Sequence, residues 1–224
     1  MGSLSYKGVE WMLNVAGIDE AGRGPILGPM VVCGVLLDRS SLPEFKAAGV
    51  RDSKMLNPRR REKLAEFILQ NAIKCEVIEL KAQEIDRLRI EEKINLNEIE
   101  AMVFAKIVNR LRPSVVYIDS PDVMVERFKN KIQGRLRVKS RLIVENYADE
   151  KYIPVSAASI VAKVRRDRRI RELQSRYGDI GSGYCSDLRT IKFLERCLAR
   201  DGILPSYARR SWSCRRLENI LGKS

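Results

Sequence analysis

Two adjacent carboxylates, Asp19 and Glu20, follow the short apolar run that begins at Val15 and precede a Gly-Arg-Gly-Pro turn at residues 22–25. An apolar segment of this length, bounded by glycine and proline, is typical of a buried strand, so both acids fall at its carboxyl end. In open α/β sheets this end is where ligands bind. A plainer interpretation is a hairpin corner whose acids pair with Arg23, and this stretch alone does not decide between the two.

Further acids occupy comparable positions later in the chain. Asp119 ends a short run of β-branched and aromatic residues, and Asp149 and Glu150 lie just before a helix that we expect Ser156 to cap. If Asp19 and Asp119 both end central strands, their side chains can meet at one edge of the sheet, where Asp149 and Glu150 could join them. Carboxylates gathered without histidine or cysteine are typical ligands of Mg²⁺ or Mn²⁺. Two such ions about 4 Å apart can activate a water molecule against a phosphodiester.

The composition narrows the chemistry further. The chain has 224 residues and no histidine, which excludes Ser-His and Cys-His nucleophiles as well as histidine metal sites. Its five cysteines are scattered without a C-x-x-C pair, which favours reduced thiols in a cytoplasmic protein. The net charge of +13 and the isoelectric point near 9.7 predict a polyanionic partner, with nucleic acid as the first candidate. No apolar stretch approaches the roughly 18 residues that span a membrane, so we expect no membrane partner.

The elements that must position these acids predict an α/β fold, a mixed sheet of five strands with helices on both faces. The expected strands start at Val15 and cover residues 30–37, 75–80, 115–119 and 142–145. The expected helices start at Asn57-Pro58 and cover residues 94–111, 123–132, 156–177, 188–200 and 211–221. The apolar face of the helix at 94–111 includes Ile99, Met102, Val103 and Ile107. We divide the chain into a short leader at 1–14, a catalytic domain at 15–180 and a small C-terminal helical lobe at 181–224.

Several segments together resemble the signature of one nuclease family. They are Ile18-Asp19-Glu20-Ala21-Gly22-Arg23-Gly24-Pro25, Asp52-Ser53-Lys54, Tyr117-Ile118-Asp119, Ala148-Asp149, the run from Val155 to Val164, and Gly181-Ser182-Gly183-Tyr184. Their order and spacing are similar to those of ribonuclease HII, in its archaeal form. The resemblance implies an RNase H-like fold and endonucleolytic cleavage of RNA in RNA/DNA hybrids. It also implies incision at ribonucleotides embedded in duplex DNA, leaving 5′-phosphate and 3′-hydroxyl ends.

The resemblance also implies roles for individual residues. The four catalytic acids of the family match Asp19, Glu20, Asp119 and Asp149, which would bind two Mg²⁺ or Mn²⁺ ions during catalysis. Of these four we choose Asp19 as the ligand that both ions share.

The remaining matches concern the nucleic acid. The backbone of Gly22, Arg23 and Gly24 matches the segment that reads the ribose 2′-hydroxyl, since glycine lets a backbone approach a sugar closely. Tyr184 matches the ring at the RNA-to-DNA step, and Lys54 matches a phosphate contact. Turn geometry, packing within the lobe and ordinary solvation are the plainer interpretations of these residues.

Several basic residues have no such assignment. We interpret the triplet at residues 59–61 as a solvated helix face. Phosphate contact and solvated surface are equally good interpretations of the stripe formed by Arg165, Arg168 and Arg169. A nucleic-acid footprint could extend into the lobe through Arg209, Arg210, Arg215 and Arg216.

The chain also departs from the family pattern, and other functions stay open. Tyr147 and Cys185 stand where the family commonly has lysine and proline. The C-terminus lacks the paired aromatics of a clamp-binding peptide, so we expect no sliding-clamp contact, and we expect a monomer. A nucleic-acid-binding module with purely structural acids and a DNA-specific nuclease or resolvase on the same fold are the competing hypotheses.

Overall fold

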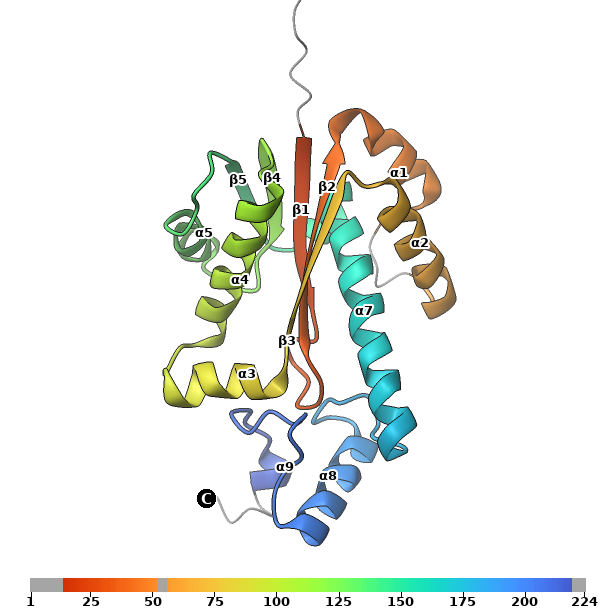
Figure 1. Cartoon of the computed structure of the whole chain (residues 1–224), viewed down its shortest axis with the longest axis vertical. Helices are drawn as coiled ribbons and strands as arrows, with labels where there is room; N and C mark the ends of the chain where they lie inside the picture. The colour runs from red at the N-terminus through yellow and green to blue at the C-terminus, as the bar shows by residue number, and fades with distance from the viewer. Residues whose placement is uncertain (1–13, 52–55, 219–224) are drawn as a thin grey trace, which may run out of the picture.

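The computed structural model describes residues 14–51 and 56–218, and its centre is a mixed sheet of five strands in the order β3-β2-β1-β4-β5 (Figure 1). The strands are β1 (Asn14–Ala21), β2 (Met30–Asp38), β3 (Lys74–Leu80), β4 (Val115–Asp119) and β5 (Arg141–Glu145). Strand β2 pairs antiparallel with β1 and β3, whereas β4 pairs parallel with β1 and β5. The α/β fold and its five-stranded mixed sheet are therefore confirmed. Of the leader expected at 1–14 only Asn14 is described, as the first residue of β1.

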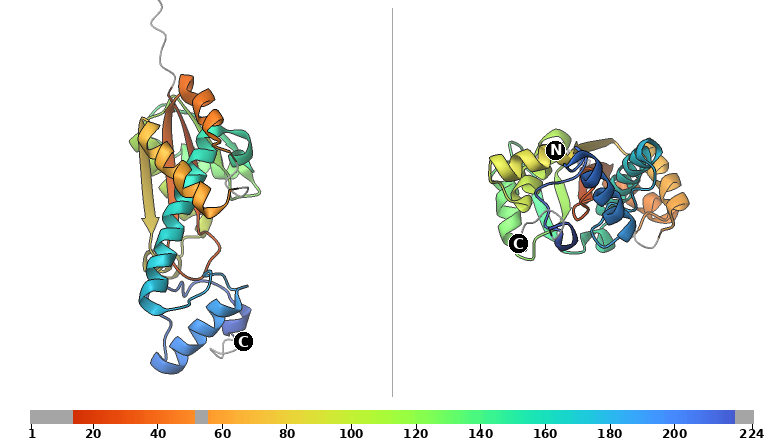
Figure 2. Two further views of the ribbon diagram at one scale, coloured as in Figure 1. Left: turned by 90° about the vertical axis from the view of Figure 1, so that its right-hand side faces the viewer. Right: turned by 90° about the horizontal axis from the view of Figure 1, so that it is seen from below.

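Helices cover both faces of the sheet (Figures 1 and 2). One face packs against α1 (Leu42–Ala48), α2 (Pro58–Asn71) and α7 (Ile153–Tyr177). The other packs against α4 (Leu96–Leu111) and α5 (Val125–Gln133). The shorter elements are η1 (Arg39–Ser41), α3 (Ala82–Asp86), the π-helical turn η3 (Arg87–Glu91), α6 (Ala148–Lys151), α8 (Leu188–Asp201) and α9 (Arg215–Glu218).

Two glycines allow the long helices to approach the sheet closely. A Cβ atom on Gly17 in β1 would lie 2.0 Å from the carbonyl carbon of Pro154, so the first turn of α7 rests on the backbone of β1. On the other face, a Cβ atom on Gly34 in β2 would lie 2.3 Å from Cγ2 of Ile107 in α4. The close approach of α7 brings the segment before it, which contains Asp149, to the end of β1.

The sequence predicted the start of α2 correctly and misplaced the start of α7. Asn57 caps α2 as expected, because its side chain accepts a hydrogen bond from the amide of Arg60 and Pro58 follows it. The expectation that Ser156 caps α7 is wrong, since the helix begins at Ile153 with proline in its first turn. Ser156 is buried, and its hydroxyl donates to the carbonyl oxygen of Asp149 at 2.5 Å.

The apolar face of α4 also differs from the expectation. Met102 is 38% exposed, whereas Glu100 is fully buried. Helical spacing alone includes Met102 in the apolar set, but the buried face of α4 includes Glu100, Ala101 and Phe104 and leaves Met102 at its edge. The short elements α1, α3, η3 and α6 have no counterpart in the predicted helices. Of the helix expected at 211–221, the structure describes α9 alone as helical.

The C-terminal part has an apolar cluster of its own, below the sheet in Figure 1. Ile191 and Leu194 of α8 pack there with Ile170 of α7 and with Ile26 and Leu27 from the β1–β2 turn. The lobe is thus built around the turn that follows the paired acids, although the expected domain boundary itself stays a prediction. Across the described ranges, no helix is both long enough and apolar enough to cross a membrane.

Candidate active site

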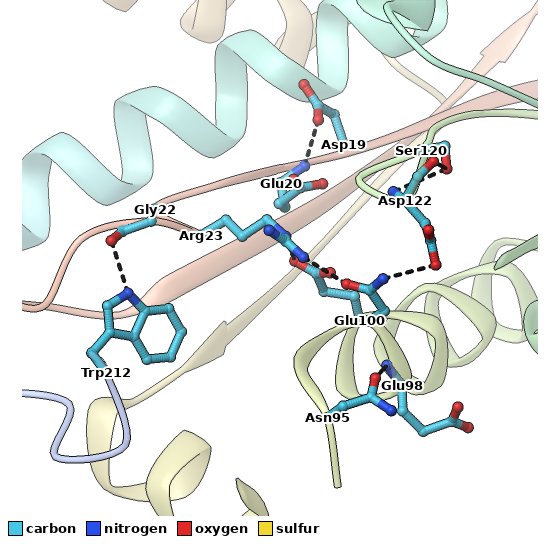
Figure 3. A network of polar contacts seen from close by, with 12 residues as sticks. Asp19, Glu20, Gly22, Arg23, Asn95, Glu98, Glu100, Ser120, Asp122 and Trp212 are labelled. Atoms are coloured by element: carbon cyan, nitrogen blue, oxygen red, sulfur yellow. Dashed lines mark hydrogen bonds and ion pairs between the residues drawn. The ribbon is translucent and has the colours of Figure 1, made fainter. Parts of the chain in front are cut away.

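The register of β1 against β4 aligns two of the acids. Ile18 is opposite Ile118, so Asp19 and Asp119 are the next residues of neighbouring parallel strands, at their carboxyl ends. Strand alternation places both on the face covered by α7, and Asp19 points toward this helix (Figure 3). Asp149 reaches the same end from α6, which leads directly into α7. The structure therefore gathers three of the four predicted acids on one face.

The acids on this face oppose one another's ionisation. Asp19 is only 5% exposed, and burial followed by the charge of Asp119 raises its pKa to about 7. A hydrogen bond with Ser159 and the charge of Lys163 act in the opposite direction, and Asp149 raises the pKa further. A bound cation on this face, in addition to Lys163, would offset the repulsion among the carboxylates, because it would favour the ionised form of all three.

Backbone groups hold Asp119 and Asp149 in place. The Oδ1 atom of Asp119 accepts a hydrogen bond from the amide of Ala148 at 2.8 Å, which joins the end of β4 to α6. Asp149 is 2% exposed, and its carbonyl oxygen accepts the hydroxyl of Ser156. The Asp119 carboxylate is thus held by the backbone of α6, whereas at Asp149 it is the main chain that the Ser156 hydroxyl fixes. The adjacent Glu150, which the sequence offered as a further companion, is exposed.

Glu20 lies on the opposite face of β1, on the side of Arg23 and α4 (Figure 3). Burial, then Asp19, then Glu100 raise its pKa well above the ordinary value, and only the charge of Arg23 opposes them. Arg23 itself is committed to α4: its Nε donates to Oε1 of Glu100 at 2.8 Å, and its Nη2 donates to Oδ1 of Asn97 at 2.6 Å. Sequence reasoning missed Glu100, because a glutamate in an amphipathic helix is usually solvent-facing.

The oxygen-only donor set suits a hard divalent cation such as Mg²⁺ or Mn²⁺. As the side chains stand, no three acids or thiols within the described residues already form a metal-holding group. Burial, followed by the charges of neighbouring carboxylates, raises the pKa values of Asp19 and Glu20, and a bound divalent cation would favour their ionised forms. The donors fit the ion, and Asp19, Glu20, Asp119 and Asp149 are the residues that would hold it.

The Gly-Arg-Gly turn is fixed by an arginine that the sequence suggested for the surface. Arg209 is fully buried, and its guanidinium donates to the carbonyl oxygens of Gly22, Arg23 and Gly28 at 2.5–3.3 Å. Its proposed part in a surface footprint is therefore wrong, because these bonds draw the side chain inside the β1–β2 turn. Gly22 needs its glycine, since φ is +80° there.

Tyr184 is brought to the same turn from the lobe. Its ring lies 3.4 Å from the position that a Cβ atom on Gly24 would occupy, and the Arg166 guanidinium lies 5.6 Å from the ring centre. A groove of about 380 Å³ joins this ring to Glu20, and the residues lining it include Gly22, Arg23, Gly24, Lys163 and Arg166. The turn, the tyrosine and one catalytic candidate thus share a single surface groove. Lys54 lies outside the described residues.

Two of the three arginines in the basic stripe on α7 form ion pairs with a carboxylate of the protein. Arg165 and Arg169 both donate to the carboxylate of Glu79 in β3, at 2.5 and 2.7 Å. Arg61, expected on a solvated face, is only partly exposed and pairs with Asp167 at 3.1 Å. Arg210 is exposed, so a role for it at the surface stays a prediction. The structure favours paired surface charges over free phosphate contacts for this stripe.

Comparison with known proteins identifies the family. The family model for Ribonuclease HII matches residues 16–215 of this chain. A Ribonuclease HII of Thermococcus onnurineus is 46% identical over 214 residues, which is 94% of this chain and 92% of that protein. This chain belongs to the Ribonuclease HII family. It is therefore a nuclease of the ribonuclease H type, a hydrolase class that acts on RNA/DNA hybrids and depends on metal ions.

Solved structures agree with this Ribonuclease HII assignment. The ribonuclease H2 of Pyrococcus horikoshii superposes with a TM-score of 0.86 at 41% identity, covering 94% of this chain and all of that one. An RNase HII of Archaeoglobus fulgidus, solved in complex with PCNA, gives 0.82 at 42% identity and covers 91% and 96% of the two chains. That complex runs against our expectation that a sliding clamp is not a partner, and residues 219–224 lie outside the described part of this chain.

Proposed function

We propose that this protein cleaves the RNA strand of RNA/DNA hybrids and incises duplex DNA at single embedded ribonucleotides, leaving 5′-phosphate and 3′-hydroxyl ends. The observation that carries the proposal is the groove in which Glu20, the Gly22–Gly24 turn and Tyr184 lie together; Glu20 directly follows Asp19, which meets Asp119 where β1 and β4 end. It supports cutting and sugar recognition at one place on the surface.

The four acids are proposed to bind metal, and Asp19 is proposed as the shared ligand. When two divalent ions are bound there, they supply an activated water and stabilise the charge on the leaving 3′ oxygen. The chain contributes the positions of the donors: Ala148 orients Asp119 through its amide, and the β1–β4 register sets Asp19 beside it. Lys163, close to Asp19, supplies positive charge on the same face.

The turn and Tyr184 are proposed to recognise the sugar. The carbonyl groups of Gly22 and Gly24 point into the protein, toward Arg209 and the indole Nε1 of Trp212. Among the described residues, no hydrogen bond is made by the amides of Gly22, Arg23 or Gly24, which suits them to a ribose 2′-hydroxyl. The Tyr184 ring, 41% exposed, is placed to pack against the following sugar.

The test uses three duplexes of one sequence: all DNA, DNA with a single ribonucleotide, and an RNA/DNA hybrid. We expect Mg²⁺-dependent cleavage of the latter two only, with loss of cleavage in EDTA and a loss of about 100-fold or more in Asp19→Asn. Cleavage of the all-DNA duplex would favour a DNA-specific nuclease instead. Undiminished cleavage by Asp19→Asn or in EDTA would contradict the metal-dependent mechanism.

A further inference from the structure

Burying the carboxylate of Glu100 under α4 costs free energy, because the group loses its hydration. Its side chain is fully buried, its Oε1 accepts one hydrogen bond from Arg23, and its Oε2 has no hydrogen-bond partner among the described residues. A buried ion pair of this kind is often no more stable than apolar residues of similar volume, because both charges lose their hydration. The stability of the fold therefore does not explain a carboxylate at this position. The ion pair that holds Arg23 in place does explain it.

Arg23 is held by α4 through two bonds in a chain of polar contacts. Asn97 and Glu100 lie one helical turn apart and bind the two ends of the same guanidinium. Asn97 also donates through Nδ2 to Oδ2 of Asp122, at 2.8 Å (Figure 3). Asp122 is bonded to Ser120, the residue after Asp119. The network therefore connects the turn after β1 with the loop after β4.

The Gly-Arg-Gly turn is thus held from two directions. Arg209 holds its carbonyl oxygens from inside the β1–β2 turn, and Glu100 holds the Arg23 side chain from α4. The Arg23 side chain is 37% exposed, so it has room to reorient if one anchor is lost. Glu100 and Asn97 of α4 are the two side chains that hold this guanidinium, so losing Glu100 leaves it with the single bond to Asn97.

We propose that Glu100 is a positioning residue that fixes Arg23, and through it Gly22 and Gly24, in the orientation that distinguishes ribose from deoxyribose. The inference rests on the proposed function of the turn as the sugar reader. Without Glu100, the partly exposed Arg23 side chain loses its ion pair and can reorient, and the amides of the turn lose their set direction. Discrimination between the two sugars then falls, while general affinity for duplex DNA does not.

The test compares Glu100→Leu and Glu100→Gln with Glu98→Gln as the matched control. Glu98 lies on the same helix, is only partly buried, and pairs with Lys131 and Arg135 instead of Arg23. Fluorescence anisotropy in EDTA gives the dissociation constants for a duplex with one ribonucleotide and for the same duplex in DNA. This measurement does not depend on the activity of the metal-loaded enzyme.

The discrimination ratio is the dissociation constant for the all-DNA duplex divided by that for the duplex with one ribonucleotide. We expect Glu100→Leu to lower this ratio about tenfold, since small misplacements of positioning groups have large effects. Its affinity for the all-DNA duplex should stay within about twofold of wild type, and its Tm should not fall. Glu100→Gln keeps an oxygen that can accept a hydrogen bond from Arg23, so its ratio should lie between those of the wild-type protein and of Glu100→Leu. Glu98→Gln should bind as wild type.

A wild-type ratio in folded Glu100→Leu would overturn the inference. If that variant does not fold, Glu100→Gln decides, because it keeps the size of the side chain and removes the charge that pairs with Arg23. A lowered ratio in Glu100→Gln supports the proposal, and a wild-type ratio refutes it. If the wild-type protein itself binds both duplexes equally, the proposed sugar recognition fails first, which separates the two conclusions.

Discussion

The two faces of the sheet treat their buried acids in opposite ways. On the α7 face, burial followed by the charge of Asp119 raises the pKa of Asp19 to about 7, with Asp149 adding to the rise and the charge of Lys163 only partly opposing it. On the α4 face, Glu100 also has a pKa raised to about 7 by burial, but Arg23 pairs with it directly. An acid that has its own arginine can organise a turn. Acids that repel one another instead form a site that an external cation completes.

The largest effect should separate two acids that follow β4. Asp119→Asn should lose about 1,000-fold in cleavage without a fall in Tm, because it removes a charge from the crowded face. Asp122→Asn should lose less than about tenfold, since Asp122 only supports Asn97. Rates at saturating Mg²⁺ and thermal unfolding check this pair, and equal rate losses would show that the faces are not functionally distinct.

The two close-packing glycines give the next comparison, in stability. Gly17→Ala should cost about 3 kcal/mol or more, because its Cβ would meet the backbone of Pro154 and Val155, which cannot rotate away. Gly34→Ala should cost about 1–3 kcal/mol, since the Ile107 and Leu111 side chains that it meets can change rotamer. Denaturant unfolding of both variants measures the difference. A smaller cost for Gly17→Ala would mean that α7 does not set the geometry of its face.

These two faces also mark where sequence reasoning succeeds and where it stops. The strands and the acids at their ends were predictable because each depends on a local pattern: an apolar run, a turn and a carboxylate at the carboxyl end. That Asp19 and Asp119 would be neighbours followed from the direction of parallel strands. The family resemblance supplied their roles, together with those of Glu20 and Asp149, which pattern alone left open.

Glu100 and Arg209 were not predictable in this way. Each is a charged residue in a segment that otherwise reads as surface, and each is buried by a partner 77 to 187 positions away. No local period encodes such a pairing, because the hydrogen bonds that justify burial exist only after the sheet has formed. The start of α7 was misplaced for a simpler reason, since Ser156 has the composition of a cap but Pro154 already begins the helix.

A pH titration of stability should sharpen the comparison between the faces. The pKa of Asp19 is about 7 in the folded protein against an ordinary 3.8, so the folded, metal-free protein retains a proton that the unfolded chain releases. Its stability contribution is full below about pH 4 and is lost as the pH rises through about 7. Glu100, raised from 4.5 to about 7, has the same sign.

Mg²⁺ should separate the two contributions. Mg²⁺ favours the charged form of Asp19. Added Mg²⁺ should therefore reduce the fall in Tm between pH 4.5 and 8 that is due to Asp19, and it should leave the fall that is due to Glu100. The variants Asp19→Asn and Glu100→Gln should each remove one part when profiles are recorded in EDTA. A profile that Mg²⁺ leaves unchanged would contradict the proposal that Asp19 binds metal.

The smallest effect concerns the arginines that are already paired. Glu79→Gln removes the acid shared by Arg165 and Arg169, and the pairing raises the pKa of Arg169, which marks a strong contact. Arg169 keeps its ion pair with Glu172, so the substitution frees Arg165. If the α7 stripe lies along the duplex, this freed cation should raise affinity about two- to fivefold and steepen its dependence on salt by about one phosphate contact. Dissociation constants between 50 and 300 mM NaCl test this. An unchanged slope would show that these arginines do not contact the phosphates. Arginines paired with a carboxylate would then have a structural role on the α7 face, as Arg23 has on the α4 face.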